Sequence, residues 1–372
     1  MPRQSVKKQE GNTSRKTAPR KTVRTRSKIV VRSEKKISPI KLSKPEANPI
    51  ISPSAENSWE AWQTFNPGAA LIKDKVHFLY RAIGDDGISR FGYASSENGL
   101  VISERLHYPV YEHILTNKRV FNPYSFASGG SFGGSEDPRI TNMENEGILY
   151  VTYTACDDGL GVALTHISEE DMLNKRWRWS PPVLISPPGE THKNWVIFPE
   201  KINGQYAILH SITPKILIEY RDTLEFKDDD YIRSRHDGTN GEKKRWESWI
   251  RGAGAPPIKT KEGWLLFYHA MDKNDPGKYK VGAILLDLND PSKILYRSPE
   301  PVLEPEKEYE NNGFKAGIVY VSGAVIKDGK LFVYYGAADN YVSVAYADLE
   351  TFLSELMKGE KPALKTGKAK KK

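Results

Sequence analysis

The stretch DPRITNMENEGILYVTYTACDDGLGVAL, residues 137–164, contains the unit from which the fold is predicted. It opens with a short proline-punctuated segment, passes a polar turn that holds Gly147 and continues into the apolar and aromatic run 149–156. A second polar turn at 157–159 leads to another apolar run. β-branched and aromatic runs bounded by polar, glycine-containing turns predict consecutive antiparallel strands.

The same arrangement recurs five times along the chain. A proline or glycine marks each unit, with spacings of 71, 61, 58 and 66 residues between Pro67, Pro138, Pro199, Pro257 and Gly323. Each unit has room for about four strands. A repeat of this length, built from strands, is typical of radial or stacked sheets, whereas sandwiches and barrels show turns without a long period. We therefore predict an all-β fold, a five-bladed β-propeller.

A propeller would bring dispersed residues together. The first strand of each blade lines the central channel, so one rim is expected to hold the residues just before the five markers, namely Asn66, Asp137, Phe198, Pro256 and Ser322. Polar residues that end the following strands are expected near one end of the channel, namely Arg81, His210, His269 and Asp339. This placement predicts that Asp137, which follows the glycine-rich loop 129–134, is a site residue.

Charge is distributed unevenly along the 372 residues. The chain carries +8 overall, with +13 in residues 1–45, +6 in residues 358–372 and −11 in the remainder. Because the N-terminal segment has few large apolar residues, we predict disordered basic tails at 1–50 and 358–372 around a propeller at 51–357. The tails are suited to non-specific contact with nucleic acid or another polyanion, or serve only solubility. The acidic remainder argues against a nucleic-acid-binding fold.

Simpler patterns predict the cellular location, the state of the cysteine and two short helices. The sequence has no run of about 18 apolar residues and no apolar segment behind its basic start, so we expect no membrane span, no secretory signal and a cytoplasmic location. The single cysteine, Cys156, excludes an internal disulfide and is predicted to be a core thiol. Ser168 is predicted to cap a short helix. A terminal helix is predicted from the spacing of Leu349, Phe352, Leu353 and Leu356.

Several chemistries lack their motifs here. No cluster has metal-ligand spacing, so no metal and no cofactor are expected. The loop 129–134 lacks the ending of a phosphate loop, and no G-x-S-x-G motif occurs. A carboxylic acid in a channel with aromatic and hydrogen-bonding side chains remains. Sugars require this combination, and glycosidic cleavage uses a carboxylic acid to protonate the leaving oxygen.

The segment GSEDPRI, residues 134–140, resembles the signature loop of glycoside hydrolase family 130. Other segments are similar to the family in the same order from about residue 60 to 350. They are Asn66-Pro67, Tyr80-Arg81, Thr152–Ala155, Phe198–Ile202, Gly252–Ile258, Gly263–Leu266, Tyr268-His269 and Tyr335–Asp339. The family comprises mannoside phosphorylases and β-mannosidases, and its five-bladed propeller agrees with the repeat count.

The resemblance implies an enzyme that cleaves β-mannosidic bonds of oligosaccharides with inversion. It implies that Asp137 is the general acid and that its proton passes through a mannose hydroxyl. Lys193 and His210 match the pocket in which phosphorylases hold inorganic phosphate, which would be a co-substrate. The candidate substrate-binding residues are Asn66, Arg81, Glu136, Arg139, Tyr153, His269 and Asp339.

Two departures from the family favour water over phosphate. No arginine follows Tyr153, and Ser211 stands after His210 where phosphorylases often have arginine. Losing two guanidiniums removes bidentate phosphate contacts. We therefore slightly favour hydrolysis, with Glu247 as the candidate that activates water. The alternatives are a mannoside phosphorylase releasing mannose 1-phosphate and, for Glu247, a structural ion pair.

Other functions fit the sequence less well. A non-catalytic glycan-binding propeller would keep the aromatic residues but would not need Asp137. A related five-bladed furanosidase would carry aspartate near its first inner strand, where this chain has Asn66. The oligomeric state and the sugar linkage stay open at this point.

Overall fold

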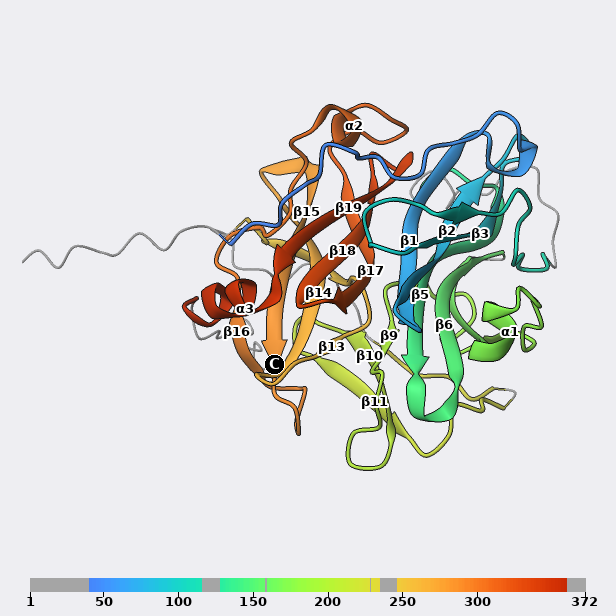
Figure 1. Ribbon diagram of the computed structural model, residues 1–372. Helices are drawn as coiled ribbons and strands as arrows, with labels where there is room; N and C mark the ends of the chain where they lie inside the picture. The colour runs from blue at the N-terminus through green and yellow to red at the C-terminus, as the bar shows by residue number, and fades with distance from the viewer. Residues whose placement is uncertain (1–39, 116–127, 158, 228, 235–245, 360–372) are drawn as a thin grey trace, which may run out of the picture. The chain divides into compact units, whose positions relative to one another are not determined.

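The computed structural model describes residues 40–115, 128–157, 159–227, 229–234 and 246–359 (Figure 1). This part of the chain consists mostly of strands with a few short helices, which confirms the all-β prediction. It contains no helix that is long and apolar enough to cross a membrane. Most of both predicted basic tails, residues 1–39 and 360–372, lies outside the described residues. Their contact with polyanions and the cytoplasmic location stay predictions.

Along the chain the described strands fall into five groups, called units here, and all pairing within each unit is antiparallel. The first contains β1 (Gln63–Ile72), β2 (Lys75–Ile83), β3 (Ile88–Ser96) and β4 (Glu104–Arg105). The second contains β5 (Gly133–Met143), β6 (Ile148–Cys156), β7 (Leu160–Ser168) and β8 (Val183–Leu184). The third contains β9 (Val196–Ile197), β10 (Tyr206–Ser211) and β11 (Leu217–Arg221). The fourth contains β12 (Trp249–Ala253), β13 (Ile258–Lys259), β14 (Trp264–Asp272), β15 (Asp275–Leu286) and β16 (Ile294–Arg297), and the fifth β17 (Val319–Lys327), β18 (Lys330–Ala337) and β19 (Tyr341–Asp348). The described strands form four sheets, the largest of which has eight strands because β3 and β5 pair in parallel.

Helices are short and lie between or after the strands. They are α1 (Glu169–Leu173), α2 (Glu308–Asn311) and α3 (Leu349–Met357), with 3₁₀ turns at Ser58–Glu60 and Glu144–Glu146. The Ser168 hydroxyl accepts the backbone N–H of Asp171 at 3.0 Å, so the predicted N-cap of α1 is confirmed. The predicted terminal helix is α3, which buries Phe352, Leu353 and Leu356.

The first strands of the units lie close to one another. β1 contacts both β5 and β17, β5 contacts β9, β10 contacts β12, and β13 contacts β17. Gly68 of β1 allows one of these approaches, because a Cβ there would lie 2.7 Å from the Pro138 carbonyl oxygen. Gly323 of β17 allows another, because its Cβ would lie 2.7 Å from the Pro67 carbonyl oxygen. The contacts therefore lead from the first unit through the others and back to the first.

A β-bulge interrupts the first strand of four units. The register shifts between Phe65 and Gly68 in β1 and between Glu136 and Arg139 in β5. Equivalent shifts occur in β12 before Gly252 and in β17 before Gly323. A bulge rotates the local backbone and redirects a side chain out of the alternating pattern of the strand. These bulges place the residues described below at the inner end of each unit.

Residues 40–51, called here the N-terminal strap, lie along the outer edge of β19 (Figure 1). Ser43 and Tyr346 exchange backbone hydrogen bonds of 2.8 and 2.9 Å, and the N–H of Val342 donates to the Ile51 carbonyl oxygen at 2.9 Å. Ile40 and Leu42 are buried. The predicted domain limits stay predictions, but the structure pairs residues 40–51, most of which were predicted to belong to the basic tail, with β19 and buries Ile40 and Leu42.

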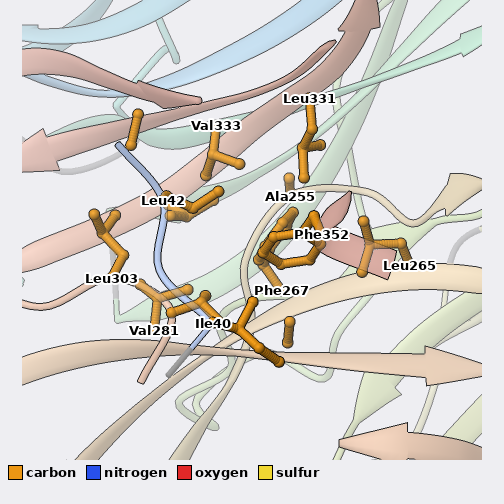
Figure 2. Close-up of a cluster of buried hydrophobic side chains, with 14 of the residues drawn as sticks. Ile40, Leu42, Ala255, Leu265, Phe267, Val281, Leu303, Leu331, Val333 and Phe352 are labelled. Atoms are coloured by element: carbon orange, nitrogen blue, oxygen red, sulfur yellow. The ribbon is translucent and has the colours of Figure 1, made fainter. Parts of the chain in front are cut away.

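The strap also completes the core between the fourth and fifth units (Figure 2). Ile40 and Leu42 join Phe267 of β14, Val333 of β18 and Phe352 of α3 in one buried cluster. The Phe267 and Phe352 rings lie 6.1 Å apart between centroids. Helix α3 therefore holds this seam by burying its apolar face.

Replacing Phe352 by alanine is expected to lower the free energy of unfolding by about 3–5 kcal/mol, because it removes a buried ring and leaves a cavity. Ser354→Ala on the exposed face of the same helix is the matched control, with a change expected within about 0.5 kcal/mol. Urea denaturation followed by tryptophan fluorescence measures both. Equal effects of the two substitutions would show that α3 does not contribute to the core in this way.

Candidate active site

One cavity lies where the five units meet, with a volume of about 190 Å³. This space is much larger than the site of a single water molecule. Each unit contributes lining residues, among them Asn66 from β1, Asp137 from β5, His210 from β10, Arg251 from β12 and Tyr320 from β17. The aromatic side chains Trp195, Tyr279 and Tyr320 form part of its wall. The cavity therefore combines ring faces with hydrogen-bonding and charged groups.

Asp137 occupies the bulge of β5 and is 3% exposed. Its Oδ1 accepts hydrogen bonds from Asn66 Nδ2 at 2.7 Å and Arg81 Nη1 at 3.2 Å. Its Oδ2 lies 4.0 Å from Lys193 Nζ. Asp137 and Asn66 have φ values of 51° and 46°, a left-handed conformation that few non-glycine residues adopt. Such strained residues concentrate at functional sites, where the surrounding structure holds them.

The two carboxyl groups of the cavity are shifted in opposite directions. Burial alone would raise the pKa of Asp137, but the charges of Arg81, Lys193 and Arg139 outweigh burial and hold the pKa well below its usual range. Burial raises the pKa of Asp339, against the attraction of Lys315, whose Nζ lies 3.4 Å from Asp339 Oδ2. Asp137 is therefore ionised in the empty cavity. An anion entering beside Lys193 would raise the pKa of Asp137, because like charge disfavours the carboxylate.

Arg81 and Glu136 lie behind Asp137 and not on the cavity wall. Arg81 is 1% exposed and donates from Nη2 to Glu136 Oε1 at 2.9 Å and from Nε to Ser89 Oγ at 2.8 Å. Its guanidinium also lies over the Phe65 ring, 4.6 Å from the centroid. Both residues were predicted to bind substrate, which stays a prediction; in the structure Arg81 contacts Asp137 and Glu136 contacts Arg81.

Arg139 lies beneath the cavity floor. It donates to the backbone oxygens of Asp137 at 2.9 Å and Gly254 at 2.8 Å. Its Nη2 donates to Asn194 Oδ1 at 2.8 Å and to the Tyr320 hydroxyl at 2.9 Å. Arg139 thereby links β5 to β17 and to the segment that follows β12, through residues that line the cavity, and its predicted contact with substrate stays a prediction.

Cationic side chains line one part of the cavity. Lys193, Arg251 and Lys315 all reach it, as does the His210 ring. Lys193 Nζ lies 3.0 Å from Glu136 Oε2 and also donates to the Ser128 hydroxyl. Burial, assisted by the charge of His192, lowers the pKa of His210 to about 4, so this ring is neutral at physiological pH. The arrangement suits an anionic ligand with several oxygen atoms.

Three predicted site residues lie away from the cavity wall. The Tyr153 hydroxyl bonds to the Tyr111 hydroxyl at 2.7 Å and to His113 Nδ1 at 2.8 Å. His269 is buried and stacks on Tyr320 with ring centroids 4.1 Å apart. Glu247 is fully buried, accepts the Tyr268 hydroxyl and lies 3.0 Å from Arg297 Nη1. Glu247 thus occupies the structural ion pair that was its alternative interpretation.

The prolines predicted to mark the rim do so in only two units. Phe198, Pro256 and Ser322 do not line the cavity, whereas Asn194 and Arg251 do. Asn194 has a φ of 65°, like Asn66, and Arg251 lies in the bulge of β12 before Gly252, which has a φ of 132°. Ser322 occupies the bulge of β17 and still does not line the cavity, so neither the marker nor the bulge by itself identifies the rim residue of every unit. A repeat aligned on Arg251-Gly252 would have found the arginine that the sequence analysis missed.

No cluster of three or more metal-ligating side chains occurs in the part of the chain that the structure describes.

A family model described as β-1,4-mannooligosaccharide phosphorylase matches residues 33–358. The chain belongs to glycoside hydrolase family 130. It is an enzyme of that family, and the resemblance stated from the sequence is confirmed.

Two relatives of this family 130 enzyme each cover more than four-fifths of its chain. A 1,2-β-oligomannan phosphorylase from Thermoanaerobacter sp. is 36% identical over 321 residues, covering 84% of this chain and 98% of that protein. A β-1,2-mannobiose phosphorylase from the same organism is 34% identical over 323 residues, covering 83% and 98%.

Solved structures of family 130 members are similar as well. A β-1,2-mannobiose phosphorylase from Listeria innocua, solved with β-1,2-mannobiose, is 26% identical, with a TM-score of 0.62 over 85% of this chain and 99% of that chain. Another structure has a TM-score of 0.65 at 26% identity, covering 84% and 95%. It is described as showing that this family of mannoside phosphorylases contains glycoside hydrolases that target β-1,2-mannosidic linkages in Candida mannan.

Proposed function

We propose that this enzyme cleaves β-mannosidic bonds by phosphorolysis and releases mannose 1-phosphate. The observation that carries the proposal is the cavity that Asp137, Lys193 and Arg251 all line. Phosphorolysis requires an acid and an anion-binding group beside the same bound sugar. The leaving oxygen must gain a proton while a phosphate oxygen attacks the anomeric carbon. The named activities of the relatives, which are phosphorylases, support the same reaction.

In the proposed reaction, a phosphate oxygen attacks the anomeric carbon as the bond to the bridging oxygen breaks. Configuration inverts, so a β-mannoside yields α-mannose 1-phosphate. Asp137 supplies the proton that the leaving sugar gains, through a mannose hydroxyl as the family resemblance implies. Asn66 and Asp339 border the same cavity and would orient the hydroxyls of the mannosyl residue.

The position of Arg251 favours phosphate over water as the acceptor of the mannosyl group. The sequence favoured water because two arginines of the phosphorylases are missing, but Arg251 enters the cavity from β12 and supplies a guanidinium fork. Lys193 and the neutral His210 complete the proposed phosphate pocket. Glu247, the candidate for activating water, pairs with Arg297 away from the cavity. These positions favour phosphate as the acceptor.

We also propose that the five antiparallel units are the blades of a five-bladed propeller. The hydrogen-bonded sheets stay open, and the support comes from contacts between neighbouring units, which lead from β1 through β5, β9, β10, β12 and β13 to β17 and return from β17 to β1. The cavity lined by all five units would then lie at the end of the central channel.

Incubation of the full chain with β-1,2-mannobiose, with and without inorganic phosphate, tests the reaction. The linkage is chosen from the names of the relatives, and β-1,4-mannobiose is the comparison. We expect mannose 1-phosphate, detected by ³¹P NMR, and little free mannose when phosphate is absent. Release of mannose without phosphate would establish hydrolysis instead. No cleavage of either disaccharide or of longer β-mannooligosaccharides would overturn the proposed function.

A further inference from the structure

Glu136 is fully buried directly behind Asp137 and receives an unusual number of donors. Its Oε1 accepts from Arg81 Nη2 at 2.9 Å and from Ser131 Oγ at 3.0 Å. Its Oε2 accepts from Lys193 Nζ at 3.0 Å and from the Ser128 hydroxyl. An arginine and a lysine can only donate, so Glu136 is bound as a carboxylate.

Asp137 and Glu136 share the same two cations. Arg81 bonds to Glu136 through Nη2 and to Asp137 through Nη1. Lys193 Nζ lies 3.0 Å from Glu136 Oε2 but 4.0 Å from Asp137 Oδ2, so it is drawn toward Glu136. Without the Glu136 charge, Asp137 would be the nearest carboxylate for both cations.

The other groups facing Asp137 come from several elements, namely Arg81 of β2, Arg139 of β5, His269 of β14, Tyr320 of β17, Lys193 before β9 and Asp339 after β18. Burial lowers the pKa of His269 to about 3 and raises that of Tyr320, so both are neutral at pH 7. Three cations therefore surround Asp137. A general acid in this position must still carry a proton when the substrates are bound.

We propose that Glu136 is a positioning residue that offsets the positive charge of Arg81 and Lys193, and so leaves Asp137 able to carry the proton that it donates. The proposal rests on the proposed function, since it assigns Asp137 the role of acid. Glu136 does not touch the substrate in this assignment. It holds Arg81 and Lys193 in place and reduces their attraction for the neighbouring carboxylate.

The test is the pH profile of kcat for wild-type enzyme and Glu136→Gln, with β-mannobiose and phosphate both saturating. Activity falls as the pH rises through the pKa of the acid in the enzyme–substrate complex. Glu136→Gln removes the charge with little change in shape. We expect its alkaline limb to shift to lower pH by about one unit, with about tenfold lower kcat above the limb.

Ser131→Ala is the matched control, because it removes a neutral hydrogen bond to Glu136 and leaves every charge in place. The alkaline limb of its pH profile of kcat is expected at the same pH as in the wild-type enzyme. Lys193→Gln removes a cation from the same cluster and should shift the limb to higher pH, which keeps the test decisive if Glu136→Gln does not fold. Glu136→Asp, which keeps the charge, should restore the limb toward the wild-type position.

A uniform fall in kcat at all pH values after Glu136→Gln, with an unshifted limb, would overturn the proposal and leave Glu136 a structural residue. Equal shifts after Ser131→Ala, or shifts of the same sign after Glu136→Gln and Lys193→Gln, would also overturn it. An inactive wild-type enzyme would instead overturn the proposed function on which the assignment rests.

Discussion

Replacing Asp137 by asparagine is expected to lower kcat for β-mannobiose by about 10²- to 10⁴-fold, because an amide cannot supply the proton to the leaving oxygen. The amide oxygen can still accept the hydrogen bonds from Asn66 and Arg81, so the cavity should keep its shape. Steady-state release of mannose 1-phosphate measures the effect.

A substrate with a good leaving group separates loss of the acid from general damage. 4-Nitrophenyl β-mannoside needs little protonation of its leaving oxygen, so Asp137→Asn should lose far less activity on it than on mannobiose. Asp290→Asn, in the loop between β15 and β16, is the control and should leave kcat unchanged. If Asp137→Asn kept mannobiose turnover within tenfold of wild type, Asp137 would not be the general acid.

The second large effect is expected at Arg251. Arg251→Ala should lower kcat/KM for phosphate by about 10- to 150-fold, because a charge-assisted hydrogen bond contributes about 1.5–3 kcal/mol. The KM for β-mannobiose should change much less, since the proposed role of Arg251 is to hold phosphate. Initial rates at varied phosphate and fixed sugar measure the two constants separately.

Two further variants make the Arg251 result specific. Arg251→Lys keeps the charge but loses the fork, so its kcat/KM for phosphate should lie between those of wild type and alanine. Arg178→Ala removes an arginine whose side chain is 74% exposed, and no effect on phosphate use is expected. An unchanged kcat/KM for phosphate in Arg251→Ala would remove Arg251 from the phosphate pocket and reopen the case for water.

The sequence predicted elements better than it predicted side-chain partners. Apolar and aromatic runs between turns identified the hairpins, a capping pattern identified α1, and the spacing of apolar residues identified α3, because all three signals depend on near neighbours in the chain. Asp137 and Asn66 were placed together because both stand directly before a proline at a unit boundary. Their contact at 2.7 Å shows that the repeat carried spatial information.

The errors have physical causes that a single sequence does not reveal. Arg251 was missed because the bulge in β12 redirects its side chain, and a bulge is a register shift between two strands. Tyr153 was expected at the sugar, yet its hydroxyl bonds to Tyr111, which lies 42 residues earlier. Glu247 likewise forms an ion pair with Arg297, a residue 50 positions later in the chain. Long-range packing decides which buried polar groups pair.

The strap at residues 40–51 has a consequence for how the protein is made. β19 pairs with a segment that is synthesised about 300 residues earlier, so residues 40–51 cannot make this pairing until translation is nearly complete. Until β19 is synthesised, the backbone groups of Ser43 and Ile51 lack the strand with which they pair. Substitutions in the strap that block this pairing, such as proline at Ser43, would therefore leave the edge of β19 uncovered, although the two segments lie far apart in the sequence.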